Sequence, residues 1–231
     1  MRAFLLSFGF AFLLACGGTP EETANLTDGA AAEFVAIKAT YRERNFEEAA
    51  KALESFLAEN PEHGTGWILM GNARREMKLN LSAKEAYKKA IAIDGLRMEA
   101  FLGLGVIARK EANAAAKKGQ KSEARSLLKI AEGHYERALS IEPFHAETLS
   151  SMAMLQLQLK QPELALRNAE KAWELSKFDG TIAANLAVAY HKNNMTEKRD
   201  LARENAKRFN YAGMDKLNEM FGIQKEAPAA E

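Results

Sequence analysis

The chain has 231 residues, of which 27% are charged, and its formal net charge at pH 7 is only +1. This balance gives no overall field that would favour binding to nucleic acid or to an acidic substrate. Cys16 is the single cysteine, so the segment after it can form no disulfide, thiolate metal site or catalytic thiol. The abundance of alanine, lysine, glutamate and leucine, with only five prolines, predicts an all-α fold.

The first feature along the chain is an apolar, uncharged stretch over residues 3–15, which follows Arg2 and ends at Cys16. A helix of that length reaches only about 20 Å, short of the ~30 Å hydrocarbon core, which favours an export signal over a membrane span. The residues LLAC at 13–16 resemble the lipobox of bacterial lipoproteins. This resemblance implies cleavage before the cysteine, a diacylglyceryl group on its thiol and acylation of the new amine. We therefore expect a lipoprotein signal peptide at 1–15 and lipidation, with incorporation of palmitate, at Cys16.

Lipidation of this kind would hold the protein on a membrane surface, since each buried methylene contributes about 0.8 kcal/mol and two or more chains anchor stably. The resemblance also implies that an aspartate after the cysteine retains a lipoprotein in the inner membrane of a Gram-negative cell. Gly17 occupies this position, so we expect attachment to the outer membrane, facing the periplasm. Small, polar and helix-breaking residues follow, and we expect residues 16–29 to form the lipidated cysteine and a flexible tether.

Between residues 30 and 210 the sequence repeats itself. The recurring residues, at separations of 34, 48 and 34, are Trp67, Phe101, Leu149 and Ala183 at one position and Gly71, Gly105, Ala153 and Ala187 at another. This pattern resembles the tetratricopeptide repeat (TPR), in which two helices occupy 34 residues. The resemblance implies an α-solenoid, a superhelix of about five helix-turn-helix units. We expect the amphipathic segment at 211–222 to be a capping helix and residues 223–231 to be a disordered tail.

The third unit contains a 14-residue excess, because its period is 48 residues instead of 34. The excess lies within about residues 106–130, where a turn at 118–121 has flanks of helical composition. We expect about two extra turns in each helix of an elongated hairpin, and no disordered loop. Its tip carries four cations that form a candidate docking prong for an acidic partner or for lipid head groups: Lys117, Lys118, Lys121 and Arg125. Such charges are more commonly found on a long helix pair whose tip is solvated and binds nothing.

The sequence contains no recognisable catalytic or metal-binding constellation. Gly103, Gly105 and Ala108 fit the G-x-G-x-x-[GA] spacing of a dinucleotide site, but such a site needs a strand before the motif and a helix that begins at it. Here the motif lies inside a predicted helix. The four histidines are scattered, and the acidic residues are not clustered. We therefore expect no enzymatic activity, no metal and no cofactor.

The TPR resemblance implies that the first helix of each unit lines a concave groove. The predicted partner-binding groove contains seven residues of these helices: Tyr41, Asn72, Arg75, Arg109, Met154, Gln158 and His191. Such a mixture of apolar side chains, amides and cations is typical of a peptide-binding surface. Some cytosolic members grip a terminal carboxylate with a clamp of lysine, asparagine and arginine. Only Asn72 matches that clamp, so this ligand is not expected.

These observations favour a lipid-anchored, non-catalytic scaffold or adaptor that assembles or stabilises a complex in the bacterial cell envelope. Its expected partners are an envelope protein or peptide and, through the lipid, the membrane. A pilotin-type factor for a type IV pilus or secretion pore is a narrower candidate, which the longer third unit weakens. Two further candidates from different classes are an enzyme with an unrecognised site in the groove and, if the signal is misread, a cytosolic TPR co-chaperone.

Overall fold

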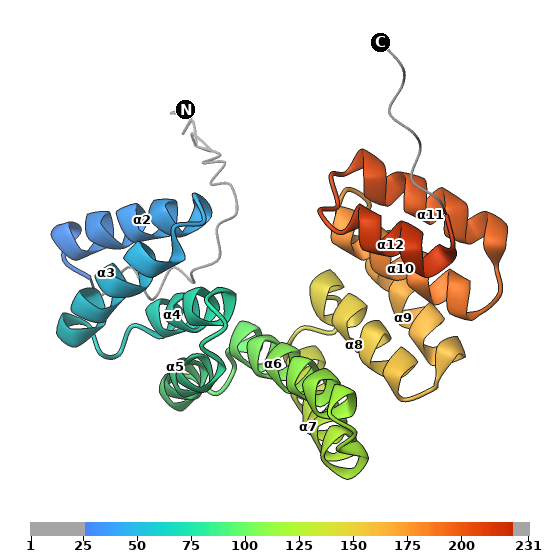
Figure 1. The fold of residues 1–231 in the computed structure, drawn as a ribbon. Coiled ribbons are helices and arrows are strands. Elements are labelled where there is room, and N and C mark those ends of the chain that lie inside the picture. The colour runs from blue at the N-terminus through green and yellow to red at the C-terminus, as the bar shows by residue number, and fades with distance from the viewer. Residues whose placement is uncertain (1–25, 224–231) are drawn as a thin grey trace, which may run out of the picture.

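The computed structural model describes residues 26–223. The expected signal peptide, Cys16, most of the tether and the tail after residue 223 lie outside this range. The described part contains eleven helices and no strand, so the all-α prediction is confirmed. In chain order (Figure 1) the helices are α2 (Asp28–Arg42), α3 (Phe46–Glu59), α4 (Gly64–Glu76), α5 (Asn80–Ile93), α6 (Met98–Lys117), α7 (Lys121–Ile141), α8 (Ala146–Gln158), α9 (Pro162–Leu175), α10 (Gly180–Lys192), α11 (Thr196–Arg208) and α12 (Met214–Phe221). None of these helices is both long and apolar enough to cross a bilayer.

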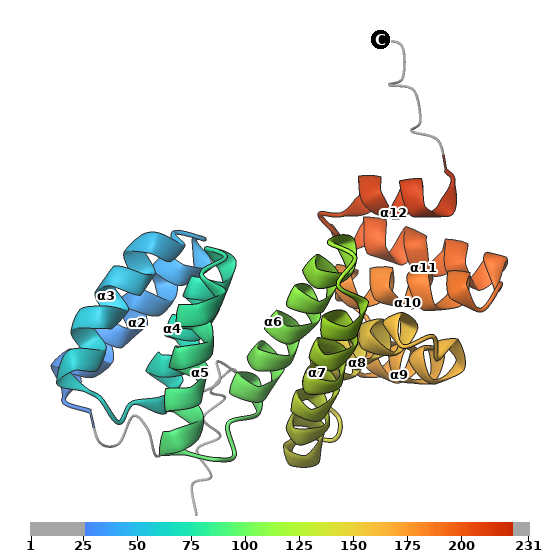
Figure 2. The ribbon, with the colours of Figure 1, turned by 60° about the horizontal axis from the view of Figure 1, so that its bottom comes forward.

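Successive helices pair into five hairpins that stack into a curved array (Figures 1 and 2). The first helices of neighbouring hairpins contact one another, α2 with α4, α4 with α6, α6 with α8 and α8 with α10. Each second helix packs between its own first helix and the first helix of the next hairpin. The first helices therefore form a continuous inner layer, and the second helices cover its outside. This arrangement confirms the α-solenoid prediction.

The helix pairs approach closely because small residues face buried tyrosines. A Cβ atom at Gly71 would lie 2.5 Å from Cε1 of Tyr87, and one at Gly105 would lie 2.5 Å from Cε1 of Tyr135. Both tyrosines are fully buried. Gly103 also contacts Tyr87, since a Cβ there would lie 2.6 Å from Cε2. The two glycines of the G-x-G motif, Gly103 and Gly105, thus lie within helix α6 and make room on its surface for the rings of Tyr87 and Tyr135.

The third hairpin is the long one. Helix α6 has 20 residues and α7 has 21, whereas α4 and α8 have 13 and α5 and α9 have 14. The additional residues are therefore helical, seven in each helix, and extend the pair by about 10 Å. Buried alanines, Ala112, Ala115 and Ala124, hold the extended part together. Nζ of Lys84 on α5 also pairs with Oε2 of Glu111 at 2.6 Å, which fixes the base of the extension.

Both ends of the array differ slightly from the expected boundaries. The first helix begins at Asp28, two residues inside the expected tether, because Oγ1 of Thr27 accepts a hydrogen bond from the Ala30 amide at 3.2 Å and caps it. At the other end the capping helix α12 begins at Met214, three residues after the expected start. It lies against α10 and α11 and buries Leu217 (Figure 2). Nε of Arg203 on α11 donates to Oδ1 of Asn218 on α12 at 2.6 Å.

Candidate functional site

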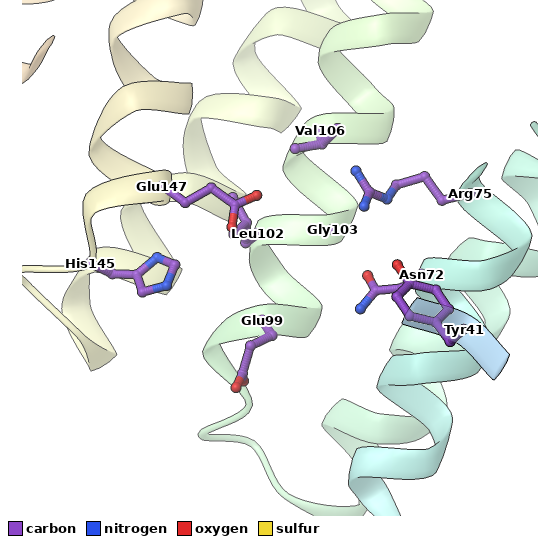
Figure 3. A pocket seen from close by; sticks show the side chains of 9 residues that line it. All are labelled: Tyr41, Asn72, Arg75, Glu99, Leu102, Gly103, Val106, His145 and Glu147. Carbon is purple, nitrogen blue, oxygen red and sulfur yellow. The ribbon is translucent and has the colours of Figure 1, made fainter. Parts of the chain in front are cut away.

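The inner layer of first helices encloses a cavity of about 330 Å³ (Figure 3). Its lining comes from α2, α4, α6 and the beginning of α8, so residues from four hairpins meet there. The lining residues are Tyr41, Asn72, Arg75, Glu99, Leu102, Gly103, Val106, His145 and Glu147. Tyr41, Asn72 and Arg75 belong to the predicted groove, and the structure brings these three together.

One wall of the cavity presents hydrogen-bond donors from α4. The hydroxyl of Tyr87 donates to Oδ1 of Asn72 at 2.7 Å, and Arg75 lies near enough for its charge to act on this hydroxyl. Because Oδ1 of Asn72 is engaged, the amide nitrogen of the same side chain is the group that can serve a ligand. Nη2 of Arg75 pairs with Oε1 of Glu76 at 3.1 Å, and 19% of the Arg75 side chain is exposed.

Burial acts on the titratable groups of this wall. Burial raises the pKa of Tyr87 far above its ordinary value, with Arg75 opposing the shift, so the hydroxyl keeps its proton. Burial by itself lowers the pKa of Arg75, but Tyr87, Glu76, Tyr41 and Glu147 outweigh it, and the pKa is raised. The guanidinium is therefore a permanent cation beside the cavity.

Glu147 and His145 at the start of α8 form the opposite wall, and Glu99 lies on α6 between the two walls (Figure 3). Glu99 lies in the first turn of α6 and Glu147 in the first turn of α8. His145 is the N-cap residue of α8, and its Nδ1 accepts from the Thr148 amide at 3.3 Å. In a neutral ring the proton is then on Nε2. The charge of Glu147 contributes to the raised pKa of Arg75, so the two walls interact electrostatically across the cavity.

The remaining predicted groove residues lie beyond the cavity lining. Arg109 occupies the position of Arg75 one unit further on: burial raises the pKa of Tyr135, and the positive charge of Arg109 opposes this shift. Met154 and Gln158 lie on α8. His191 on α10 packs against Phe221 of the capping helix, with ring centroids 4.9 Å apart. Helix α12 therefore covers part of the groove at His191.

The two glutamates of the cavity lining were missed by sequence reasoning. Glu99 and Glu147 are 48 residues apart and occupy equivalent positions of two units, which is a detectable signal. However, a glutamate in the first turn is also the ordinary partner of a helix N-terminus. The repeat spacing alone therefore could not show whether these glutamates only stabilise their helix N-termini or also line a cavity.

The cations of the candidate docking prong form a separate surface. Lys117 and Lys118 end α6, while Lys121 and Arg125 lie at the start of α7, and all four are exposed. None of them lines the cavity. Within residues 26–223 no group of three or more His, Cys, Asp or Glu side chains is placed to hold a metal ion.

Comparison with solved structures identifies the fold. A thermophilic TPR protein of Thermus thermophilus superposes with a TM-score of 0.71 at 16% identity, covering 84% of this chain and 97% of that one. The fold is that of TPR proteins. PilF of Pseudomonas aeruginosa matches with a TM-score of 0.55 at 17% identity and 84% coverage of each chain. YrrB, described as a TPR protein with an unusual peptide-binding site, matches with a TM-score of 0.50 at 17% identity, covering 80% of this chain and 88% of that one. No protein-family model and no curated protein sequence matches the chain.

Proposed function

We propose that this protein is a non-catalytic, lipid-anchored TPR scaffold that binds a segment of a partner protein in its concave cavity. The observation that carries the proposal is the cavity itself, which draws its lining from four successive hairpins. Curved repeat arrays use such concave surfaces for binding. A volume of about 330 Å³ lies at the small end of the range for ligand pockets and suits one or two side chains of an extended segment.

The lining supports recognition better than chemistry. The Tyr87 hydroxyl has a strongly raised pKa and is held by its hydrogen bond to Asn72, which suits a structural role. The apolar side chains of Leu102 and Val106 lie between the two charged walls and give an extended segment a surface to cover. Nδ1 of His145 lies 2.8 Å from Oγ1 of Thr148, but Thr148 is fully buried, so this hydroxyl does not face a ligand in the cavity as a nucleophile would.

The membrane part of the proposal is based on the lipobox at residues 13–16. Acyl chains on Cys16 would keep the scaffold at the outer membrane and raise the local concentration of its bound partner there. Metabolic labelling with palmitate tests this part. Label on the wild-type chain that disappears in Cys16→Ala supports it, whereas an unlabelled, soluble wild-type protein excludes it and favours the cytosolic co-chaperone.

The partner-binding part is tested by photo-crosslinking in the native envelope. A photoreactive phenylalanine analogue replaces Tyr41, which lines the cavity, and in a control chain it replaces Phe144, an aromatic residue that is 68% exposed and lies outside the cavity. We expect one discrete protein adduct from position 41 that position 144 does not give. Adducts of equal pattern from both positions would contradict binding in the cavity.

A pilotin-type role is the narrower candidate, motivated by a lipobox followed by a TPR array. The fold similarity to PilF, which extends over 84% of both chains, favours it. The long α6–α7 hairpin departs from the 34-residue period and stands against it. Identification of the position-41 adduct as a subunit of a pilus or secretion pore would support this role, and any other envelope protein would exclude it.

A further inference from the structure

We infer that the cavity recognises a pair of opposite charges on its ligand, namely a lysine or arginine side chain next to an acidic group in an extended peptide. This inference rests on the proposed function and specifies the chemistry of the partner segment. Its basis is the separation of charge in Figure 3, where Asn72 and Arg75 face Glu147 and His145 across the cavity. Leu102, Gly103 and Val106 of α6 line the space between them.

The α4 wall has the donors that an acidic group needs. Arg75 lines the cavity with 19% of its side chain exposed, and its guanidinium points toward Gly103 and Val106 in Figure 3. Its ion pair with Glu76 uses Nη2, so the other terminal nitrogen is the donor for a ligand. The neighbouring amide nitrogen of Asn72 adds a second donor, since Oδ1 already accepts from Tyr87. Two donors of this kind side by side suit a carboxylate, and a hydrogen bond to a charged group is about twice as strong as a neutral one.

The two glutamates of the cavity lining call for a cation. Glu99 and Glu147 take part in none of the ion pairs found within residues 26–223. With Arg75, the cavity lining carries one positive and two negative formal charges, so it is net acidic when empty. A ligand that brought only a carboxylate would meet uncompensated repulsion from these glutamates. A basic side chain next to the carboxylate removes that repulsion and matches both walls.

Blocked hexapeptides test the inference on the purified, full-length mature protein. The reference peptides are Gly-Ser-Lys-Asp-Ser-Gly and its Asp-Lys isomer, and the comparison peptides replace Lys by Gln, Asp by Asn, or both. Isothermal titration calorimetry measures the dissociation constants. We expect at least one order of the charged pair to bind about tenfold more tightly than either singly charged peptide. Free lysine, which carries one carboxylate and two ammonium groups without a peptide backbone, is expected to bind more weakly than the paired peptide.

Variants of the two walls assign the contacts. In Arg75→Gln the preference for Asp over Asn should disappear while the preference for Lys over Gln stays, and Glu147→Gln should show the reverse. Arg74→Gln is the matched control on the same helix, because Arg74 has a similar exposure of 21% and its own 3.1 Å ion pair with Glu54. Glu163→Gln is the control for loss of a first-turn glutamate, since Glu163 lies in the first turn of α9. Neither control should change either preference.

The outcomes separate the inference from the proposed function. Equal binding of all peptides, or binding of none while position 41 still crosslinks a partner, overturns paired-charge recognition and leaves the proposed function standing. Free lysine binding as tightly as the peptide also overturns the inference, because the ligand is then an amino acid. No peptide binding together with no crosslink at position 41 contradicts both.

Discussion

Substitution of Gly105 by alanine tests the packing that sets the distance between helices α6 and α7. In an open helix interior, glycine to alanine is stabilising by about 0.5–1 kcal/mol because the backbone of the unfolded chain is less free. At this site the new Cβ would lie 2.5 Å from Cε1 and 2.6 Å from Cδ1 of Tyr135, whose ring is fully buried and cannot swing into solvent. Overpacking of this kind costs about 1–3 kcal/mol. The net expectation is a protein less stable by about 0.5–2 kcal/mol.

Gly133 provides the matched control, since it lies in α7 of the same hairpin and a Cβ there meets nothing within 4 Å. Gly133→Ala should therefore stabilise the protein by about 0.5–1 kcal/mol. Urea unfolding of both variants, followed by far-ultraviolet circular dichroism, measures the two changes in the free energy of unfolding. Their difference isolates the overpacking cost. Equal stabilisation by both substitutions would refute the assignment of Gly105 as the contact point of Tyr135.

Three further predictions concern the prong, the outer layer and the cap. Replacing Lys117, Lys118 and Lys121 together by glutamate should weaken capture of the crosslinked partner without a change in the unfolding midpoint; unchanged capture would leave the prong with a structural role only. Burial, followed by the charges of nearby lysines, lowers the pKa of His134, so the unfolded chain binds the proton more readily and stability should fall as pH drops below about 6.5, with a shallower fall in His134→Gln. Leu217→Ala removes the buried contact of α12, and hydrogen exchange should show that helix opening before the rest of the array, whereas unchanged protection of α12 would contradict its capping role.

Local repetition explains why the fold could be predicted from the sequence. A small residue at Gly71 and a tyrosine at position 87 recur one unit later as Gly105 and Tyr135, and each pair is a contact inside one hairpin. The lengthened hairpin could also be predicted from the sequence, because the residues on both sides of Gly119 are strong helix formers. Only the turn needs a special conformation, which Gly119 adopts with its positive φ of 78°.

The candidate site was harder to predict from the sequence, because it depends on how several repeat units curve around one another. Tyr41, Asn72 and Arg75 follow from the repeat register, but the convergence of Glu99 and Glu147 on them is a result of tertiary arrangement. Likewise the contact of His191 with Phe221 arises from α12, which follows no repeat period.

The most direct test combines the anchor and the cavity in one measurement: the location of the position-41 adduct after fractionation of the cell envelope. For the wild-type chain, we expect a palmitate-labelled adduct in the outer-membrane fraction, and for Cys16→Ala an unlabelled adduct that leaves this fraction. An adduct that is absent, or that is found in the soluble fraction for both chains, would contradict a membrane-bound scaffold that holds its partner in the concave cavity.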